Sequence, residues 1–435
     1  MRRFPLVLAT LALAPSLLPC QVGSPAGPVP VERLQARRAA LLSRIGTGIA
    51  VLRSADERSI EGDYPQDSDY REDNDFFYLT GLEAPGGWLV LASRDTAPPE
   101  VILYLPARDT VQERWTGAQL GPGPEATALT GIAEVRSSDR AEADIRRMVN
   151  MARRRSGRLF LKLGERAVSD SFLRELALGS GAGAVDLRPE LAALRVVKDD
   201  DEMRRLRRAI TVSTDGHLAA MRIAKPGAWE YELEAAAEGT FRRLGAERLG
   251  YPSIVGAGFN GTTLHYDKSR SQLAAGDLIV MDMGAEFGYY TADVTRTIPA
   301  SGKFTTRQRA IYNLVLATQQ AAIDSVRPGI TMSRLGQIAR DFMRANSGDL
   351  CQPGTCDRYF IHGLGHWIGM DVHDVGDYAQ PLVPGMVLTI EPGIYIPEEK
   401  LGVRIEDDIL VTATGHELLS SGAPRKAEEV ERAVR

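Results

Sequence analysis

The chain has 435 residues, enough for two or three domains, and its 44% hydrophobic and 25% charged residues are typical of a globular protein. Its formal net charge of −5 argues against a nucleic-acid partner, because such partners are bound by strongly basic surfaces.

We expect residues 1–20 to be an export signal rather than part of the fold. Two arginines open the segment, and the mostly apolar run 4–18 that follows is too short for a convincing membrane span. Leu17–Cys20 resembles a lipoprotein processing site, which would place a lipid anchor on Cys20, although Pro19 departs from the small residue expected there. The sequence therefore predicts an exported protein, periplasmic or secreted, with lipidation of Cys20 left open.

Residues 21–30 are rich in Gly, Pro and Ser and are predicted to be a linker. Residues 31–194 are predicted to form a separate N-terminal α/β domain, because helical and strand patterns alternate along them. The charged stretch Arg195–Asp200 marks the expected boundary with a catalytic domain over 195–435. In the N-terminal domain the predicted helices cover 31–42 and 140–153, a polar loop covers 54–72, and the predicted strands cover 46–52, 76–82, 88–92, 101–105 and 159–162.

The glycines of Gly256–Gly261 match the GxGxxG pattern of dinucleotide-binding loops, and Asp282 follows at about the distance expected of a ribose ligand. That fingerprint needs a helix directly after the glycines, with its N-terminus facing the pyrophosphate. Residues 262–266 are predicted to be extended instead, so we do not expect a nucleotide site.

The stretch Gly276–Ile298 carries two acids, Asp282 and Asp293, in apolar surroundings. Leu278–Met281 is predicted to be a buried strand and Tyr289–Ile298 its return strand, with glycines at the turn between them. Such a hairpin brings the two carboxylates side by side, and because they repel each other, one would be protonated or both would hold a cation. One face of the return strand is expected to carry Tyr289, Thr291, Asp293, Thr295 and Thr297.

Further candidate metal ligands follow in the sequence: His366, Glu391 and Glu406. One imidazole and four carboxylates suit one or two divalent ions such as Mn, Co or Zn better than a structural zinc site. Each acid taken alone is more simply explained as a solvated group or a turn cap, but the five together favour a metal site.

An internal repeat supports this interpretation. Gly276–Gly284 is echoed by Gly385–Gly393, and in both copies an acid follows the first glycine by six residues. Each copy also has a histidine upstream of that acid, His265 in the first and His373 in the second. Two similar halves predict a site at their junction. The predicted helices repeat as well, over 203–221 and 229–244 in the first copy and over 307–326 and 332–345 in the second.

At this point a family resemblance is plain. The set Asp282, Asp293, His366, Glu391 and Glu406 resembles the five-ligand signature of the dinuclear metallopeptidases with the pita-bread fold, and the chain is most similar to the Xaa-Pro aminopeptidases (aminopeptidase P) among them. The resemblance spans about residues 198–412 and all five positions match. It implies an α+β catalytic domain with pseudo-two-fold symmetry that holds two divalent metal ions, Mn first and Co or Zn as alternatives. It also implies hydrolysis of the bond between an N-terminal residue and a following proline by a metal-activated water.

The same resemblance implies catalytic roles for five side chains. Glu391 is expected to carry a proton as well as to bind metal. His265 and His373 are expected to hold the substrate carbonyl and the tetrahedral intermediate, and His362 is expected near the substrate. Arg404, two residues before the last ligand, is expected to orient a carboxylate.

Residues 70–92 and 105–121 resemble the N-terminal domain of bacterial and organellar Xaa-Pro aminopeptidases. In that group a tryptophan at the position of Trp115 reaches the active site of a neighbouring subunit, so a dimer or tetramer is implied; an ordinary core or surface aromatic is the alternative. This domain favours an aminopeptidase over an Xaa-Pro dipeptidase (prolidase) or a methionine aminopeptidase. A non-catalytic peptide-binding module on the same fold is disfavoured, because all five ligands are present.

Cys351 and Cys356 flank a Pro-Gly pair that favours a turn. An exported protein permits a disulfide between them, and two free thiols are the alternative.

Overall fold

The structure is a computed structural model that describes residues 25–56, 70–94, 97–164, 170–179 and 183–434. The predicted export signal, the anchor at Cys20 and most of the predicted polar loop 54–72 lie outside the described residues. Residues 25–30 of the predicted linker lie within them, and Ala26 and Val29 there are buried. The domain limits drawn from the sequence stay predictions.

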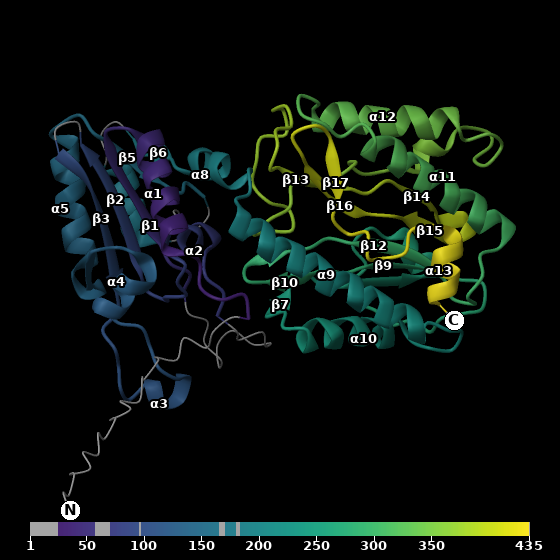
Figure 1. Ribbon diagram of the computed structural model, residues 1–435, viewed down its shortest axis with the longest axis horizontal. Coiled ribbons are helices and arrows are strands. Elements are labelled where there is room, and N and C mark those ends of the chain that lie inside the picture. The colour runs from purple at the N-terminus through teal and green to yellow at the C-terminus, as the bar shows by residue number, and fades with distance from the viewer. Residues whose placement is uncertain (1–24, 57–69, 95–96, 165–169, 180–182, 435) are drawn as a thin grey trace, which may run out of the picture.

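The first part of the chain folds around a mixed six-stranded sheet with the order β4-β3-β2-β1-β5-β6. Its central strand β1 (Gly48–Arg53) has side chains that alternate between two apolar cores, so both faces of the sheet need a helical cover. Helix α1 covers one face and α5 covers the other (Figure 1), and α7 shares the apolar core of α5. The other strands are β2 (Trp88–Arg94), β3 (Ala97–Leu105), β4 (Glu134–Ser137), β5 (Arg158–Leu161) and β6 (Val185–Asp186). The helices are α1 (Val31–Ile45), α2 (Asn74–Thr80), α3 (Glu113–Thr116), α4 (Pro124–Thr130), α5 (Ala141–Arg153), α7 (Ser171–Leu178) and α8 (Arg188–Arg195).

The strand predicted over 76–82 is wrong, because this segment is the helix α2. Asp73 caps its start by accepting hydrogen bonds from the backbone N–H groups of Asp75 and Phe76, and Gly81 ends it in the left-handed conformation with φ of 69°. Every residue of α2 is buried, so its apolar run shows no helical period. Such a run cannot be told from a buried strand by periodicity.

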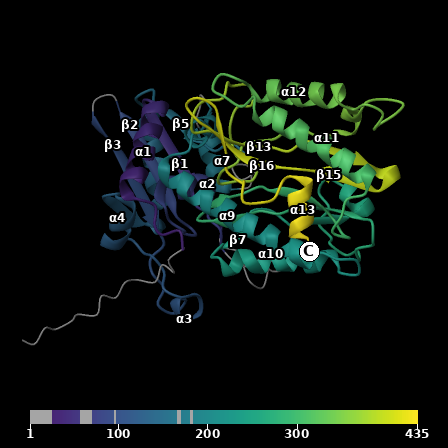
Figure 2. The ribbon, with the colours of Figure 1, turned by 45° about the vertical axis from the view of Figure 1, so that its right-hand side comes forward.

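The second part of the chain has two helix pairs with strands between them, α9 with α10 and α11 with α12 (Figures 1 and 2). Its helices are α9 (Asp200–Ile223), α10 (Glu230–Arg243), α11 (Thr306–Ile323), α12 (Met332–Ala345) and α13 (Ala427–Ala433), with short 3-10 turns η2 (Gly258–Thr262), η3 (Cys356–Tyr359) and η4 (Pro397–Glu399). Its strands are β7 (Arg248–Leu249), β8 (Ile254–Ala257), β9 (Leu278–Asp282), β10 (Ala285–Phe287), β11 (Tyr290–Thr291), β12 (Thr295–Pro299), β13 (Val387–Ile390), β14 (Gly393–Ile396), β15 (Leu401–Arg404), β16 (Asp407–Val411) and β17 (His416–Leu418).

The two predicted copies of the repeat fold alike. In the first, β9 pairs antiparallel with β12, and in the second, β13 pairs antiparallel with β16. A β-bridge between Thr295 and Glu406 joins the two sheets at their shared edge. Arg296 strengthens this junction: its buried guanidinium donates to the carbonyl oxygen of Glu406 at 2.6 Å and to Asp407 Oδ1 at 2.6 Å. The site predicted at the junction of the halves therefore has a rigid frame.

The single return strand predicted over Tyr289–Ile298 is divided in the structure. Its first part, β11, pairs with β10, and its second part, β12, pairs with β9. Asp293 lies in the irregular segment between them, so it does not share a continuous strand face with its neighbours. Gly284 makes the crossing of the chain possible, because a Cβ there would lie 1.9 Å from the carbonyl oxygen of Ala292.

The predicted disulfide between Cys351 and Cys356 is confirmed, and both cysteines are buried. None of the helices in the described part of the chain combines the length and the apolar character needed to cross a bilayer.

A close backbone approach at Gly402 gives the first testable prediction. A Cβ at Gly402 would lie 1.9 Å from the carbonyl oxygen of Gly261, where β15 packs against η2. Gly402→Ala should therefore destabilise the protein by about 1–3 kcal/mol, the usual cost of overpacking. Thermal unfolding of Gly402→Ala against Gly415→Ala measures this, because a Cβ at Gly415 meets nothing within 4 Å. Equal unfolding midpoints for the two variants would contradict the packing described here.

Candidate active site

The five predicted ligands converge where the two halves meet. Asp282 ends β9, and Asp293 lies just before β12. Glu391 directly follows β13, and Glu406 lies just before β16. The two pairs of acids thus occupy equivalent places in the two halves. His366 comes from the loop that precedes β13.

Backbone hydrogen bonds fix the chain at the ligands of the second half. His366 and Thr389 are tied twice, because the His366 N–H donates to Thr389 Oγ1 at 3.0 Å and the Thr389 N–H donates to the His366 carbonyl at 2.9 Å. The Glu391 N–H donates to the carbonyl of Leu364 at 2.8 Å. Gly365 allows this approach, since a Cβ there would lie 2.0 Å from the Thr389 carbonyl oxygen.

Asp293, His366 and Glu406 form the centre of the site, with one donor atom from each lying within 4.8 Å of the others. His366 Nε2 lies 3.3 Å from Asp293 Oδ2 and 3.5 Å from Glu391 Oε1. On the other side of the ring, Nδ1 lies 3.1 Å from the carbonyl of Trp367, which turns Nε2 toward the carboxylates. This is the arrangement of a metal-binding histidine.

Asp282 and Asp293 are linked through the Tyr251 hydroxyl, which lies 2.6 Å from an oxygen of each. One O–H group can donate to only one of two carboxylates, so the pair needs a proton or a cation. Arg404 Nη2 donates to the other oxygen of Asp282 at 2.5 Å. Burial raises the pKa of Asp282, while at Asp293 the hydrogen bond and charge of His366 outweigh burial and lower the pKa.

The remaining acids strongly resist ionisation. Burial and the repulsion of Asp293, which the charges of His366 and Arg404 only partly offset, raise the pKa of Glu391 to about 7. Burial and the charge of Asp293 raise the pKa of Glu406 well above its usual value. Although burial opposes it, the hydrogen bond with Asp293 raises the pKa of His366 to about 9. Without a cation, the cluster is therefore kept partly protonated, and four carboxylates with one imidazole fit a divalent ion that would replace those protons.

A second chain of hydrogen bonds borders the ligands. His362 Nε2 lies 2.8 Å from the Tyr395 hydroxyl, and Arg404 Nη1 donates to the same hydroxyl at 3.1 Å. Burial and the charge of Arg404 lower the pKa of His362 to about 4, so its imidazole is neutral at pH 7. Arg404 thus contacts both Tyr395 and the ligand Asp282, as its expected orienting role requires.

His265 and His373 lie at the solvent-exposed side of the site. The ring of His373 lies 4.2 Å from that of His366, and the pKa of His373 is lowered by partial burial and by the nearby charges of His366 and His265. The structure therefore brings both histidines to the open side of the carboxylate cluster.

Sequence reasoning missed two residues that contact the predicted ligands, the half-buried Tyr251 and the buried Asp408. Tyr251 lies outside both repeated segments, and a lone tyrosine before a strand carries no spacing signal. Asp408 Oδ2 accepts a hydrogen bond from the Asp293 N–H at 3.3 Å, and its Oδ1 has no hydrogen-bond partner in the described structure. Its place directly after Glu406 and Asp407, in a run of three acids, could have marked it.

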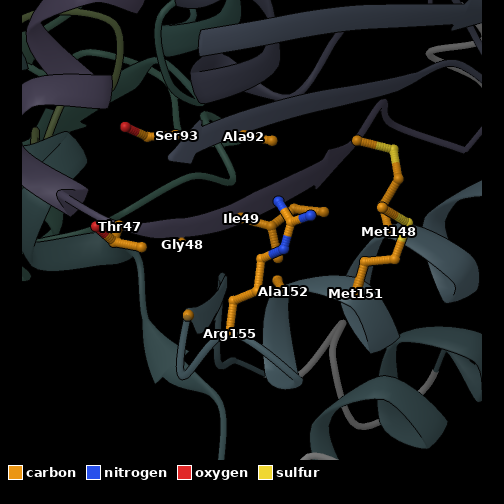
Figure 3. A pocket seen from close by; sticks show the side chains of 10 residues that line it. Thr47, Gly48, Ile49, Ala92, Ser93, Met148, Met151, Ala152 and Arg155 are labelled. Atoms are coloured by element: carbon orange, nitrogen blue, oxygen red, sulfur yellow. The ribbon is translucent and has the colours of Figure 1, made fainter. Parts of the chain in front are cut away.

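Two other features are not part of this site. The glycines of Gly256–Gly261 lead into η2 and a turn, so the extended segment predicted over 262–266 is wrong. No α-helix follows before β9 in these fully described residues, whereas a dinucleotide fingerprint needs one directly after the glycines. A cavity of about 250 Å³ lies between α5 and the strands β1 and β2 (Figure 3). The residues that line it come well before the five predicted ligands in the sequence, and none of those ligands is among them.

Two known protein families match parts of this chain. Residues 204–413 match Metallopeptidase family M24, and residues 34–156 match the N-terminal domain of aminopeptidase P. The chain is 36% identical to the Xaa-Pro aminopeptidase of Escherichia coli, over 92% of this chain and 97% of that relative.

Solved structures agree with the fold. Proline aminopeptidase P II from Yersinia pestis has a TM-score of 0.83 at 33% identity and covers 93% of this chain and 99% of its own. Zinc-substituted E. coli aminopeptidase P in complex with product has a TM-score of 0.84 at 32% identity, over 94% and 99%. The predicted α/β N-terminal domain and pita-bread catalytic domain are thereby confirmed.

The raised pKa values predict how metal binding depends on pH. The pKa values of His366, Glu391 and Glu406 are raised in the folded chain, so their bound protons stabilise it at low pH. The protons of Glu391 and His366 are lost as pH rises through about 7 and about 9. The lowered pKa of Asp293 changes nothing above about pH 4. The affinity of the metal-stripped protein for Mn²⁺ should therefore rise about tenfold per pH unit for each proton displaced.

Calorimetric titration with Mn²⁺ at pH 6 and pH 8.5, in two buffers of unlike ionisation enthalpy, measures both the affinity and the protons released. An affinity that does not change with pH, with no proton release, would show that the cluster is already ionised.

Proposed function

This chain belongs to metallopeptidase family M24, with an N-terminal domain of the aminopeptidase P type, and from this we propose that it removes the N-terminal residue from peptides whose second residue is proline. It is a metal-dependent hydrolase. The observation that carries the proposal is the buried cluster of four carboxylates and one imidazole at the junction of the two halves.

We assign two divalent ions to this cluster, with Mn²⁺ as the first choice and Co²⁺ or Zn²⁺ as alternatives. Asp282 and Asp293 come from the first half, and His366, Glu391 and Glu406 come from the second, so each half offers donors for one ion. Bound here, the ions would polarise the scissile carbonyl and lower the pKa of a water toward neutrality.

The residues of the chain supply the proton transfer and the charge stabilisation. Glu391, at the edge of the cluster, can accept a proton from the attacking water and return it to the leaving proline nitrogen. His265 and His373, on the open side of the cluster, stabilise the negative charge that develops on the carbonyl oxygen.

His362 and Arg404 hold the geometry around the reacting groups. The neutral imidazole of His362 is held at both ring nitrogens, by the Tyr395 hydroxyl and the Gly363 carbonyl, and its partly exposed ring carbons can contact the substrate. Arg404 keeps one oxygen of Asp282 engaged, so that the other is directed toward Tyr251 and the cluster.

We further propose that the protein is exported and forms homo-oligomers. The buried Cys351–Cys356 disulfide and the sequence of residues 1–20 support export, with a lipid anchor at Cys20 as an option. Val111 and Trp115, beside and within α3, are 65% and 84% exposed, which supports contact with a second copy.

The substrate proposal is tested by a paired assay. The protein, stripped of metal and reloaded with Mn²⁺, should cleave an Xaa-Pro-Xaa tripeptide and leave an Xaa-Pro dipeptide nearly untouched. The same tripeptide with alanine in place of proline is the control. Preferred dipeptide cleavage would instead make the protein a dipeptidase, and no cleavage of either with Mn²⁺, Co²⁺ or Zn²⁺ would exclude the proposed reaction.

The role of His373 gives a further prediction. His373→Ala should lower kcat about 10²- to 10³-fold, because it removes one group that stabilises the developing oxyanion. Metal content should stay unchanged, since His373 is not among the assigned ligands. Steady-state kinetics and elemental analysis check both points against His416→Ala, a histidine on β17 that lies outside the cluster. A wild-type kcat in His373→Ala would remove this residue from the mechanism.

A further inference from the structure

We propose that Arg195 is a positioning residue through which the N-terminal domain holds the loop that carries His373. The inference rests on the proposed function, because it takes His373 to stabilise the charge that develops during hydrolysis. It goes further in assigning the N-terminal domain a direct part in the geometry of the active site.

The guanidinium of Arg195 connects three elements. Arg195 is the last residue of α8 and is 2% exposed. Its Nη1 donates to Asp75 Oδ1 of α2 at 2.8 Å. Its Nη2 donates to Asp374 Oδ1 at 2.5 Å and to Asp371 Oδ2 at 3.1 Å. One planar cation thus joins the N-terminal domain to two carboxylates that flank His373 in sequence.

Asp374 is held on its second oxygen as well. Its Oδ2 lies 3.2 Å from Lys198 Nζ, and its backbone N–H donates to the carbonyl of Trp367 at 2.9 Å. Gly369 makes room for this carboxylate, because a Cβ there would lie 2.1 Å from Asp374 Oδ2. Although burial works against it, the charges of Arg195 and Lys198 lower the pKa of Asp374, so the carboxylate stays ionised.

His373 itself depends on these neighbours for its position. Its side chain is exposed, and within the described part of the chain its ring makes no hydrogen bond. The ring contact with His366, at 4.2 Å between centroids, is the interaction that places it over the ligands. The backbone on both sides of His373 therefore decides whether its ring can reach this contact.

Packing holds the first part of this loop, since Ile368 and Met370 are buried in the apolar core of the N-terminal domain and the Met370 carbonyl accepts a hydrogen bond from Arg71 at 2.9 Å. A cavity of about 380 Å³ lies beside the ion pairs of Arg195, between α2, α8 and the loop that carries His373. Its lining includes Arg195, Asp75 and Asp371. After Met370 the loop borders this open space, and there Asp371 and Asp374 make the connection to the N-terminal domain through Arg195. A lysine at position 195 could not reproduce it, since an ammonium group lacks the planar fork that engages carboxylates on two sides.

The test uses the full-length, metal-loaded protein and the Xaa-Pro-Xaa tripeptide. Arg195→Lys should lower kcat about 10- to 100-fold, the cost of a misplaced catalytic group, with little change in KM or metal content. Arg205→Lys is the matched control: Arg205 is equally buried, its Nε donates to Asp201 at 2.8 Å, and it does not contact the loop. Asp75→Asn serves as a milder second variant: it keeps the Arg195–Asp374 pair and weakens the link to α2, together with the ion pair of Asp75 with Lys162 inside the N-terminal domain.

A double-variant cycle separates positioning from general destabilisation. If Arg195 acts through His373, Arg195→Lys should have little further effect on kcat in the His373→Ala background. The same fold-loss in both backgrounds, or wild-type kcat in Arg195→Lys and Asp75→Asn while His373→Ala is impaired, would overturn the proposal and leave the proposed function intact.

Hydrogen exchange tests the proposal without any activity. Residues 369–375 should exchange faster in Arg195→Lys than in the wild type, while Arg205→Lys should leave this segment unchanged. Unaltered exchange over 369–375 in Arg195→Lys would overturn the proposal even if the wild type cleaved no Xaa-Pro peptide, an outcome that would itself count only against the proposed function.

Discussion

The main constraint on this structure is the electrostatic repulsion among four carboxylates that lie close together in a buried place. Like charges at this distance repel strongly where water is scarce, so the chain cannot keep all of them ionised by itself. The pKa values of Asp282, Glu391 and Glu406 are raised accordingly. Other features of the second domain either hold these acids in place against the repulsion or supply part of the compensating charge.

The compensation comes from both halves of the domain. Arg404 partly neutralises Asp282, and His366 does the same for Asp293. Thr295 donates to Glu406 at 2.6 Å, so a residue of the first half fixes an acid of the second. Arg296 then ties the strands of the two halves together. What remains uncompensated is a concentration of negative charge that a pair of divalent ions is suited to neutralise.

The sequence alone was sufficient to predict which side chains meet at the junction of the halves, the repeat and the disulfide, because each has a local signature. Asp282 and Glu391 stand at the same spacing in two apolar segments flanked by glycines, and this spacing is visible in the sequence itself. The division of the return strand was not predictable in this way, since it depends on the close crossing at Gly284. The contacts of Tyr251 with the acids and of Arg195 with the loop were not predicted, because they join residues far apart in the chain. Such contacts leave no regular spacing in the sequence.

The bridge between Thr295 and Glu406 has a consequence for how the protein matures. The first half contributes only Asp282 and Asp293, and the imidazole and the other two acids follow much later in the chain. A growing chain therefore cannot assemble a complete site until the final strands have docked. Before that point the full set of donors that would bind an ion is not in place. Metal acquisition is then a late event that follows folding, and it takes place in whichever compartment the folded protein has reached.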